Sequence, residues 1–255
     1  MMKIGLALSG GGARGVAHVG VIKALEEMNI EINVVSGTSA GSIVGALYAY
    51  GYNPDEIFDI VKDVTAFRSV RPAWTWAGLL TMDGLREMLS NAMPENDFKA
   101  LKKPLTIAAT EIRKGEIQYF DEGELIPAIV SSCSVPAVFN PVSYNGGLFV
   151  DGGLFDNLPS KIIRDSCDFL IGSHCNPIST NFDAKSLRVI IERSLLMAIN
   201  ANTSHSKKFC DVVIEPKKLD SFSSFEIARA KEIFDIGYEF TKANFTAEDF
   251  KKTSS

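Results

Sequence analysis

Long apolar runs and an excess of basic residues are both missing from this sequence of 255 residues. No stretch approaches the roughly 18 apolar residues that a membrane-spanning helix needs. Lys and Arg total 26 against 31 Asp and Glu, for a net charge of −5, so we expect no nucleic-acid partner. An acidic chain also gains little long-range attraction to anionic membranes, so any membrane contact is expected to be transient, apolar and local.

Cysteines are few, and their spacing excludes the common metal-binding patterns. Cys133, Cys167, Cys175 and Cys210 form no C-x-x-C pair and match no zinc-finger or ribbon spacing. Scattered cysteines of this kind are usually small buried residues. We therefore expect a reduced, cytoplasmic protein with no metal and no other cofactor. Nothing in the sequence indicates an oligomeric state.

Apolar residues are plentiful, at 46% of the chain, and short strand-like runs alternate with helix-like ones. This alternation predicts an α/β fold, with a mostly parallel central sheet covered by helices on both faces in three α/β/α layers. We expect one domain over residues 1–250 and a frayed tail over 251–255. The predicted strands are Ile4–Ser9, Asn33–Ser36, Leu105–Glu111, Leu148–Asp151, Phe169–Ser173 and Val212–Glu215. The predicted helices are Ala13–Met28, Gly41–Tyr50, Pro54–Val64, Gly84–Ala92, Asp183–Asn202 and Ser224–Lys242, with Pro54 in a first turn and Asp83 as an N-cap.

The segment Gly37–Gly41 reads G-T-S-A-G and lies between an apolar strand and a small-residue helix. G-x-S-x-G in this setting is typical of a nucleophile elbow, in which a serine occupies a strained strand-to-helix turn. Ser39 would be that nucleophile, and the helix N-terminus favours the negative charge that develops beside it. The structural alternative is a tight glycine turn with a capping serine.

A second glycine motif, G-G-G-A-R-G over Gly10–Gly15, follows the first predicted strand. It contains G-x-G-x-x-G, but a dinucleotide fold needs an acidic residue at the end of the second strand, where this chain has the elbow. We therefore interpret the loop as an oxyanion hole, formed by Gly10, Gly11 and Gly12 together with Ala40 of the elbow. For Arg14, added charge at the hole and simple anchoring of the loop are equally open.

A serine nucleophile needs a proton acceptor, and the chain has three histidines. His18 is expected to pack inside the first helix, and His205 to be exposed in a polar stretch. His174 follows a predicted strand and is a rival base. Asp151 also ends an apolar strand, and the two glycines after it would project its carboxylate at the same sheet edge.

These motifs carry a resemblance to a known family. G-G-G-x-R-G, G-x-S-x-G and D-G-G at Asp151–Gly153 resemble, in type and order, the motifs of the patatin-like phospholipases. The segment Ser131–Val142, with Pro136, is similar to the family's serine-x-x-proline stretch, and D-N-L-P at Asp156–Pro159 follows as it often does in that family. The resemblance covers about 150 residues and implies the patatin-like three-layer fold.

The resemblance implies a serine lipid acyl hydrolase, a phospholipase, lysophospholipase or carboxylesterase that works without a metal. Ser39 would be the nucleophile, Asp151 the base and the glycine loop the oxyanion hole, with an acyl-enzyme intermediate. An aspartate with an ordinary pKa is a weak base, so we expect burial to raise it and a carboxylate to set the acidic limb of activity. Transfer of the acyl group to another acceptor, or a silent lipid-binding regulator on the same fold, are the alternatives.

Several further residues are expected to shape the site. An apolar flap containing Trp74, Trp76, Leu79 and Leu80 would line the site of a lipid ester substrate, unless its aromatics simply fold onto the core. Pro136 and the serines before it are expected to form a wall. Asp156 is expected to cap a following helix, and Asn157 to orient a loop.

Overall fold

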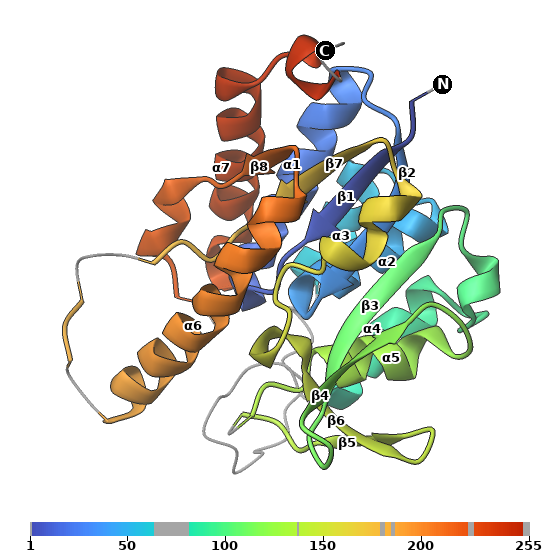
Figure 1. Cartoon of the computed structure of the whole chain (residues 1–255), viewed down its shortest axis with the longest axis vertical. Helices are drawn as coiled ribbons and strands as arrows, with labels where there is room; N and C mark the ends of the chain where they lie inside the picture. Colours follow the sequence, from blue (N-terminus) through green and yellow to red (C-terminus); the bar gives the residue numbers. More distant parts are fainter. Residues whose placement is uncertain are drawn as a thin grey trace.

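The computed structural model describes residues 2–63, 82–136, 138–178, 182–184, 187–223 and 227–251. Over these residues, eight strands form one sheet through the centre of the molecule (Figure 1). Its neighbours follow the order β5-β6-β3-β2-β1-β7-β8, and β4 pairs with β3. The strands are β1 (Ile4–Leu8), β2 (Ile32–Thr38), β3 (Leu105–Glu111), β4 (Glu116–Phe120), β5 (Val142–Tyr144), β6 (Gly147–Asp151), β7 (Phe169–Ser173) and β8 (Val212–Ile214).

Five of these strands, β1, β2, β3, β7 and β8, run parallel. β4 and β6 run antiparallel to β3, and β5 forms a hairpin with β6. The predicted mostly parallel sheet is therefore confirmed, with an antiparallel extension at one side. The carboxyl ends of β1 and β2 lie together, because Leu8 pairs with Gly37.

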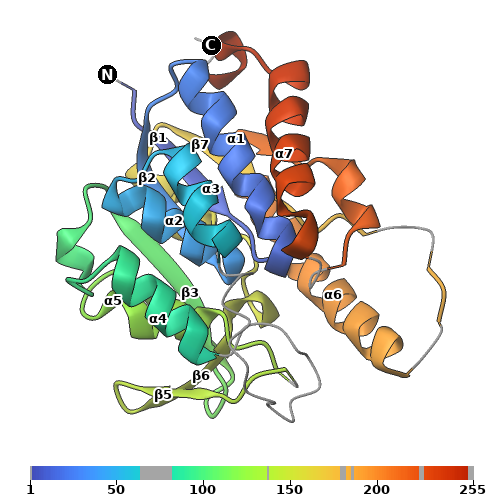
Figure 2. The ribbon, with the colours of Figure 1, turned by 180° about the vertical axis from the view of Figure 1, so that it is seen from behind.

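Seven α-helices accompany the sheet in the described part of the chain, and most cover one face, the near side in Figure 2. Strand side chains alternate between the two faces: Leu6 and Leu8 enter a large core, whereas Ala7 packs with Leu158 and Ile163 in a small one. The short 3-10 helix Lys161–Ser166 covers that second face. The three layers are thus present but unequal. The helices are α1 (Val16–Glu27), α2 (Ala40–Tyr50), α3 (Pro54–Asp63), α4 (Met82–Ala92), α5 (Leu125–Ser132), α6 (Leu187–Ser206) and α7 (Ala230–Asn244).

Some local features differ from the sequence-based expectations. β4, β5 and α5 were not predicted; α5 contains Pro127, which is tolerated because it lies in the first turn. α4 already includes Met82, so Asp83 lies within its first turn and is not the N-cap. Pro54 begins α3 as predicted. Within the described residues, no helix is both long and apolar enough to cross a bilayer.

Candidate active site

Ser39 occupies a strained turn between β2 and α2. Its backbone angles, φ 53° and ψ −125°, are rare for a residue with a side chain. The turn fits only because its neighbours are glycines: a Cβ at Gly37 would lie 2.5 Å from the Gly41 carbonyl oxygen, and one at Gly41 would lie 2.4 Å from the Leu8 carbonyl oxygen. This is the backbone geometry of a nucleophile elbow, at the start of a helix.

β2 and β6 approach each other along one edge of β3. Thr38 of β2 pairs with Ala108, and Asp151 of β6 pairs with the next residue, Ala109. β4 occupies the opposite edge over the same residues. Because β2 is parallel and β6 antiparallel to β3, their carboxyl ends meet head to head. This arrangement brings Ser39 and Asp151 together.

The Asp151 carboxyl group is buried and close to the Ser39 hydroxyl. Burial raises the pKa of Asp151 to about 6, and hydrogen bonding from the Ser39 hydroxyl and the Gly153 amide opposes that rise. The Gly153 N–H donates to Asp151 Oδ1 at 2.8 Å and orients the carboxylate. Asp151 is thus ionised at neutral pH yet a stronger base than an exposed aspartate.

The hydroxyl groups of two serines form hydrogen bonds with the backbone of Ser39. The Ser39 N–H donates to Ser132 Oγ at 2.8 Å, and Ser132 Oγ–H donates to the Ala108 carbonyl at 2.6 Å. Ser42 Oγ–H donates to the Ser39 carbonyl at 2.6 Å. Ser132 lies in the predicted serine-rich wall, but its link to the Ser39 backbone was missed, since nothing local in the sequence indicates it.

The glycine loop lies beside the elbow. Gly12 has φ 57°, and a Cβ at Gly15 would lie 2.4 Å from that of Ala40, so both positions favour glycine. The Gly10 N–H donates to the Asn157 carbonyl at 3.1 Å. Its inclusion among the oxyanion donors is therefore corrected: that N–H is already engaged, which leaves the backbone of Gly11, Gly12 and Ala40 for that role.

Other polar groups anchor the loop. Arg14 is buried and donates through Nε and Nη2 to the Phe222 carbonyl, at 2.7 and 2.5 Å, so it ties the loop to the segment before α7. Asn176 Nδ2–H donates to the Gly10 carbonyl at 2.8 Å. Asn157 Oδ1 lies against Gly10 and Gly153, between the two glycine motifs. Asn157 therefore contacts both loops, in line with the orienting role expected from the sequence.

The histidines are held in other networks. His18 is buried in α1, with Nδ1 at 2.7 Å from Ser173 Oγ and Nε2 at 2.9 Å from the Ser9 carbonyl, and burial lowers its pKa to about 4. His174 is also buried, and its Nδ1 lies 2.7 Å from Glu215 Oε1. Burial lowers the pKa of His174 despite that partner. His205 is exposed, as expected.

Asp156 has a structural role that differs from the predicted one. Its carboxylate accepts hydrogen bonds from Tyr119 at 2.8 Å and from Ser206 at 2.9 Å, and its carbonyl accepts one from Thr38. The following 3-10 helix begins after Ser160, so Asp156 is not its cap. The expected capping role was wrong. Asp156 instead forms hydrogen bonds to three elements, β2, β4 and α6.

The predicted lipid-facing walls are described only in part. Trp74, Trp76, Leu79 and Leu80 lie outside the described residues. Pro136 is half-buried in the turn after α5. Nearby, burial raises the pKa of the Cys133 thiol, with Asp151 adding to the rise, so this cysteine stays protonated.

Sequence reasoning missed the contribution of α6. Asn202 Nδ2–H donates to the carbonyls of Gly153 and Leu154 at 3.0 and 3.1 Å, and Asn202 Oδ1 accepts the Asn157 N–H at 3.2 Å. Thr203 Oγ1 lies 3.3 Å from Asn157 Nδ2. These contacts join α6 to the D-G-G turn, although about 50 residues of sequence separate the two. No local sequence pattern predicts such contacts.

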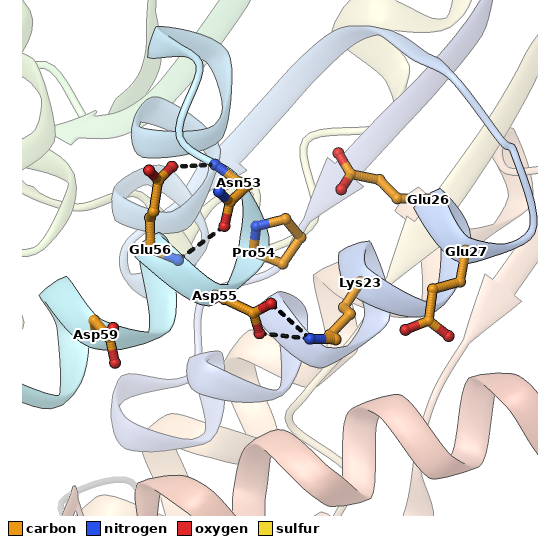
Figure 3. Close-up of a pocket in the computed structure, with 8 residues that line it drawn as sticks. All are labelled: Lys23, Glu26, Glu27, Asn53, Pro54, Asp55, Glu56 and Asp59. Carbon is orange, nitrogen blue, oxygen red and sulfur yellow. Dashed lines mark hydrogen bonds and ion pairs between the residues drawn. The ribbon is translucent and has the colours of Figure 1, made fainter.

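A surface hollow between α1 and α3 has a different chemistry (Figure 3). Five of its eight lining residues are acidic, and Lys23 bonds Asp55 at 2.5 and 2.7 Å. Asn53 and Glu56 exchange reciprocal hydrogen bonds that cap α3. These contacts give polar side chains of the hollow a structural role. Neither Ser39 nor Asp151 lines the hollow.

Comparison with known proteins identifies relatives. The family model of patatin-like phospholipase matches residues 6–163. Lysophospholipase NTE1 of Meyerozyma guilliermondii is 27% identical over 276 residues, covering 96% of this chain and 19% of that protein. An uncharacterized NTE family protein of Mycobacterium bovis is 35% identical over 160 residues, covering 62% of this chain and 44% of that protein. This chain therefore spans less than half the length of these curated relatives.

Among solved structures, VipD from Legionella pneumophila is similar with a TM-score of 0.48 and 16% sequence identity. The similarity covers 92% of this chain and 67% of that one.

Proposed function

The chain belongs to the patatin-like phospholipase family, and on that premise we propose that it is a serine lipid acyl hydrolase that uses a Ser39–Asp151 dyad. The observation that carries this proposal is the strained Ser39 elbow beside a buried carboxyl whose pKa is raised to about 6. The proposed substrates are phospholipids, lysophospholipids or simple carboxylic esters. The four free cysteines are compatible with the reducing cytoplasm as the site of action.

The proposed reaction proceeds in two halves. Ser39 Oγ attacks the ester carbonyl carbon while its proton passes to Asp151, and the carbonyl oxygen becomes an oxyanion. The N–H groups of Gly11, Gly12 and Ala40 stabilise that oxyanion. The tetrahedral species collapses, the C–O bond to the alcohol or lysolipid breaks, and Asp151 returns the proton to the leaving oxygen.

The second half releases the acyl group. Water attacks the acyl-enzyme carbonyl and gives a proton to Asp151, the bond to Ser39 Oγ breaks, and Ser39 regains its proton as the fatty acid leaves. An alcohol or lysolipid in place of water would give acyl transfer with the same residues. Loss of one oxyanion donor in such sites typically costs about 10²–10³ in rate.

The test compares the wild type with Ser39→Ala, Asp151→Asn and His174→Ala on a medium-chain p-nitrophenyl ester across pH. The proposal predicts loss of activity in the first two variants, while both stay folded. Because the base must be ionised, kcat/KM should rise with pH through about 6, and this limb should persist in His174→Ala. Activity lost with Ser39 but kept in Asp151→Asn would assign the base to His174. No activity in folded wild type on esters or phospholipids would favour a silent regulator.

A further inference from the structure

α6 carries exposed apolar side chains on its outer side, where an ordinary surface helix is polar. Three of the side chains that face the protein over its second half, Asn202, Thr203 and Ser206, are polar and hydrogen-bonded to other segments, and Ile199 lies beside them. The exposed stripe over the preceding turns is largely apolar: it contains Ile190, Ile191, Met197, Ala198 and Ala201. We call these five residues the α6 outer face. Helices of soluble domains normally bury such a stripe.

Exposed apolar side chains gather at this helix. Eight large hydrophobic side chains are exposed in the described part of the chain. Three of them, Ile190, Ile191 and Met197, belong to α6, and a fourth, Phe182, lies against Arg193 of that helix. Single exposed apolar residues are ordinary, whereas a concentration on one element indicates an interaction surface.

The charge on α6 also differs from that of the chain. Its sequence holds two arginines, Arg188 and Arg193, and one acidic residue, Glu192, within a chain of net charge −5. The Arg193 guanidinium lies over the Phe182 ring at 5.2 Å. An apolar stripe accompanied by arginine is the pattern of helices that lie in the headgroup region of a phospholipid layer.

α6 contacts the candidate active site directly. Asn202 holds the backbone of Gly153 and Leu154, so Phe155 lies one residue beyond that contact. Ile199 Cδ1 lies 3.6 Å from the position of a Cβ on Gly153. Figures 1 and 2 both show α6 (orange) projecting from the side of the body.

We propose that the α6 outer face, together with Phe155, docks on a phospholipid surface and brings the active site to its substrate. This inference rests on the proposed lipid hydrolase function. Apolar contact supplies the binding, and Arg193 contributes attraction to the phosphate groups. A second copy of the chain is the competing occupant, and the apolar character predicts that binding to zwitterionic vesicles survives high salt.

The test uses flotation of the full chain with phosphatidylcholine vesicles, at low and high salt. The variant is Ile190→Glu/Met197→Glu, two positions seven residues apart on one side of the helix. We expect at least about a tenfold loss of vesicle binding and of vesicle-lipid hydrolysis, since two charges enter an apolar contact. Hydrolysis of a monomeric ester and the unfolding temperature should stay unchanged. Ile190→Leu/Met197→Leu should bind like the wild type.

Ile162→Glu is the matched control. Ile162 is 43% exposed, against 42% for Ile190, but lies on the 3-10 helix Lys161–Ser166. It should leave vesicle binding intact. Wild type that fails to float, or a double variant that floats equally well, would overturn the proposal. So would light scattering that shows a wild-type dimer dissociated by the double variant. Vesicle binding lost in the double variant, from a wild type that hydrolyses no ester, would keep the docking surface and reject the hydrolase.

Discussion

At the scale of single residues, Asp151 illustrates how the base that we propose and a stable fold make opposite demands. Its burial raises the pKa to about 6, which makes the carboxylate a stronger base. The unfolded chain releases this proton near the ordinary value of 3.8, so the folded chain binds more protons between these two pH values. The stability therefore falls as pH rises through that window, because the ionised form is buried.

We predict that Asp151→Asn is more stable than the wild type above about pH 7. A shift of roughly two units corresponds to up to about 3 kcal/mol in the free energy of unfolding, or several degrees in Tm. The amide oxygen can still accept the Gly153 N–H. Thermal unfolding at pH 8 and pH 4 measures the effect, and the difference should shrink towards zero at the lower pH. An equal difference at both values would contradict the raised pKa.

Ser131 and Ser132 form a natural pair for testing the support of the elbow. Both are buried in α5, but Ser132 Oγ bonds the Ser39 N–H, whereas Ser131 Oγ has no hydrogen-bond partner among the described residues. Ser132→Ala should cost about 1–3 kcal/mol and lower kcat, because it leaves a buried N–H unpaired. Ser131→Ala should change neither by much. Denaturant unfolding and ester kinetics on both variants provide the comparison, and equal effects would reject the assigned support.

The local structure of the candidate site could be predicted where a short motif carries it. Gly37–Gly41 and Asp151–Gly153 predict tight turns after strands. In the structure, the Ser39 hydroxyl and the Asp151 carboxyl lie next to each other. Gly10 and Asp156 were misjudged for one reason. Their polar groups have partners, Asn157 for Gly10, and Tyr119 and Ser206 for Asp156, that only the fold brings near.

At the scale of elements, the meeting of β2 and β6 at one edge of β3 creates the candidate dyad. The parallel strands were predictable as apolar runs with helices between them. The antiparallel direction of β6 was not, because it depends on β4 and α5, which intervene between β3 and β6 and were not predicted. The side chains of β4 are mostly exposed or half-buried, and α5 contains a proline. The sequence pattern therefore predicts neither element strongly.

α6 offers a second test at this scale. Asn202→Ala removes the side-chain hydrogen bonds to the D-G-G turn, so we expect kcat to fall about tenfold with little change in KM. Asn200→Ala is the control: its Nδ2–H donates within α6, to the Leu196 carbonyl at 3.0 Å. Steady-state kinetics on a monomeric ester compare the two. If both variants keep wild-type kcat, α6 does not position Asp151.

At the scale of the whole molecule, one sheet carries two cores of unequal size. The larger core, under α1, α2 and α7, holds β1, β2 and β7 in register, and their carboxyl ends present the glycine loop and the elbow. We propose that residues 1–250 act as one domain, since one sheet links strands from Ile4 to Ile214 and Tyr238 of α7 bonds Glu27 of α1. α6 joins this body through the hydrogen bonds of Asn202 and Ser206 and leaves its apolar stripe outward, the feature on which the proposed docking to a lipid surface rests.

The most direct test of the dyad is reaction of the intact protein with a fluorophosphonate probe, which modifies activated serines. We expect one added label on the wild type, mapped by peptide mass spectrometry to Ser39, none on Ser39→Ala, and much slower labelling of Asp151→Asn at neutral pH. The labelling rate of the wild type should rise with pH through about 6, as Asp151 ionises. A label on another residue, or labelling of Asp151→Asn at the wild-type rate, would contradict the Ser39–Asp151 dyad.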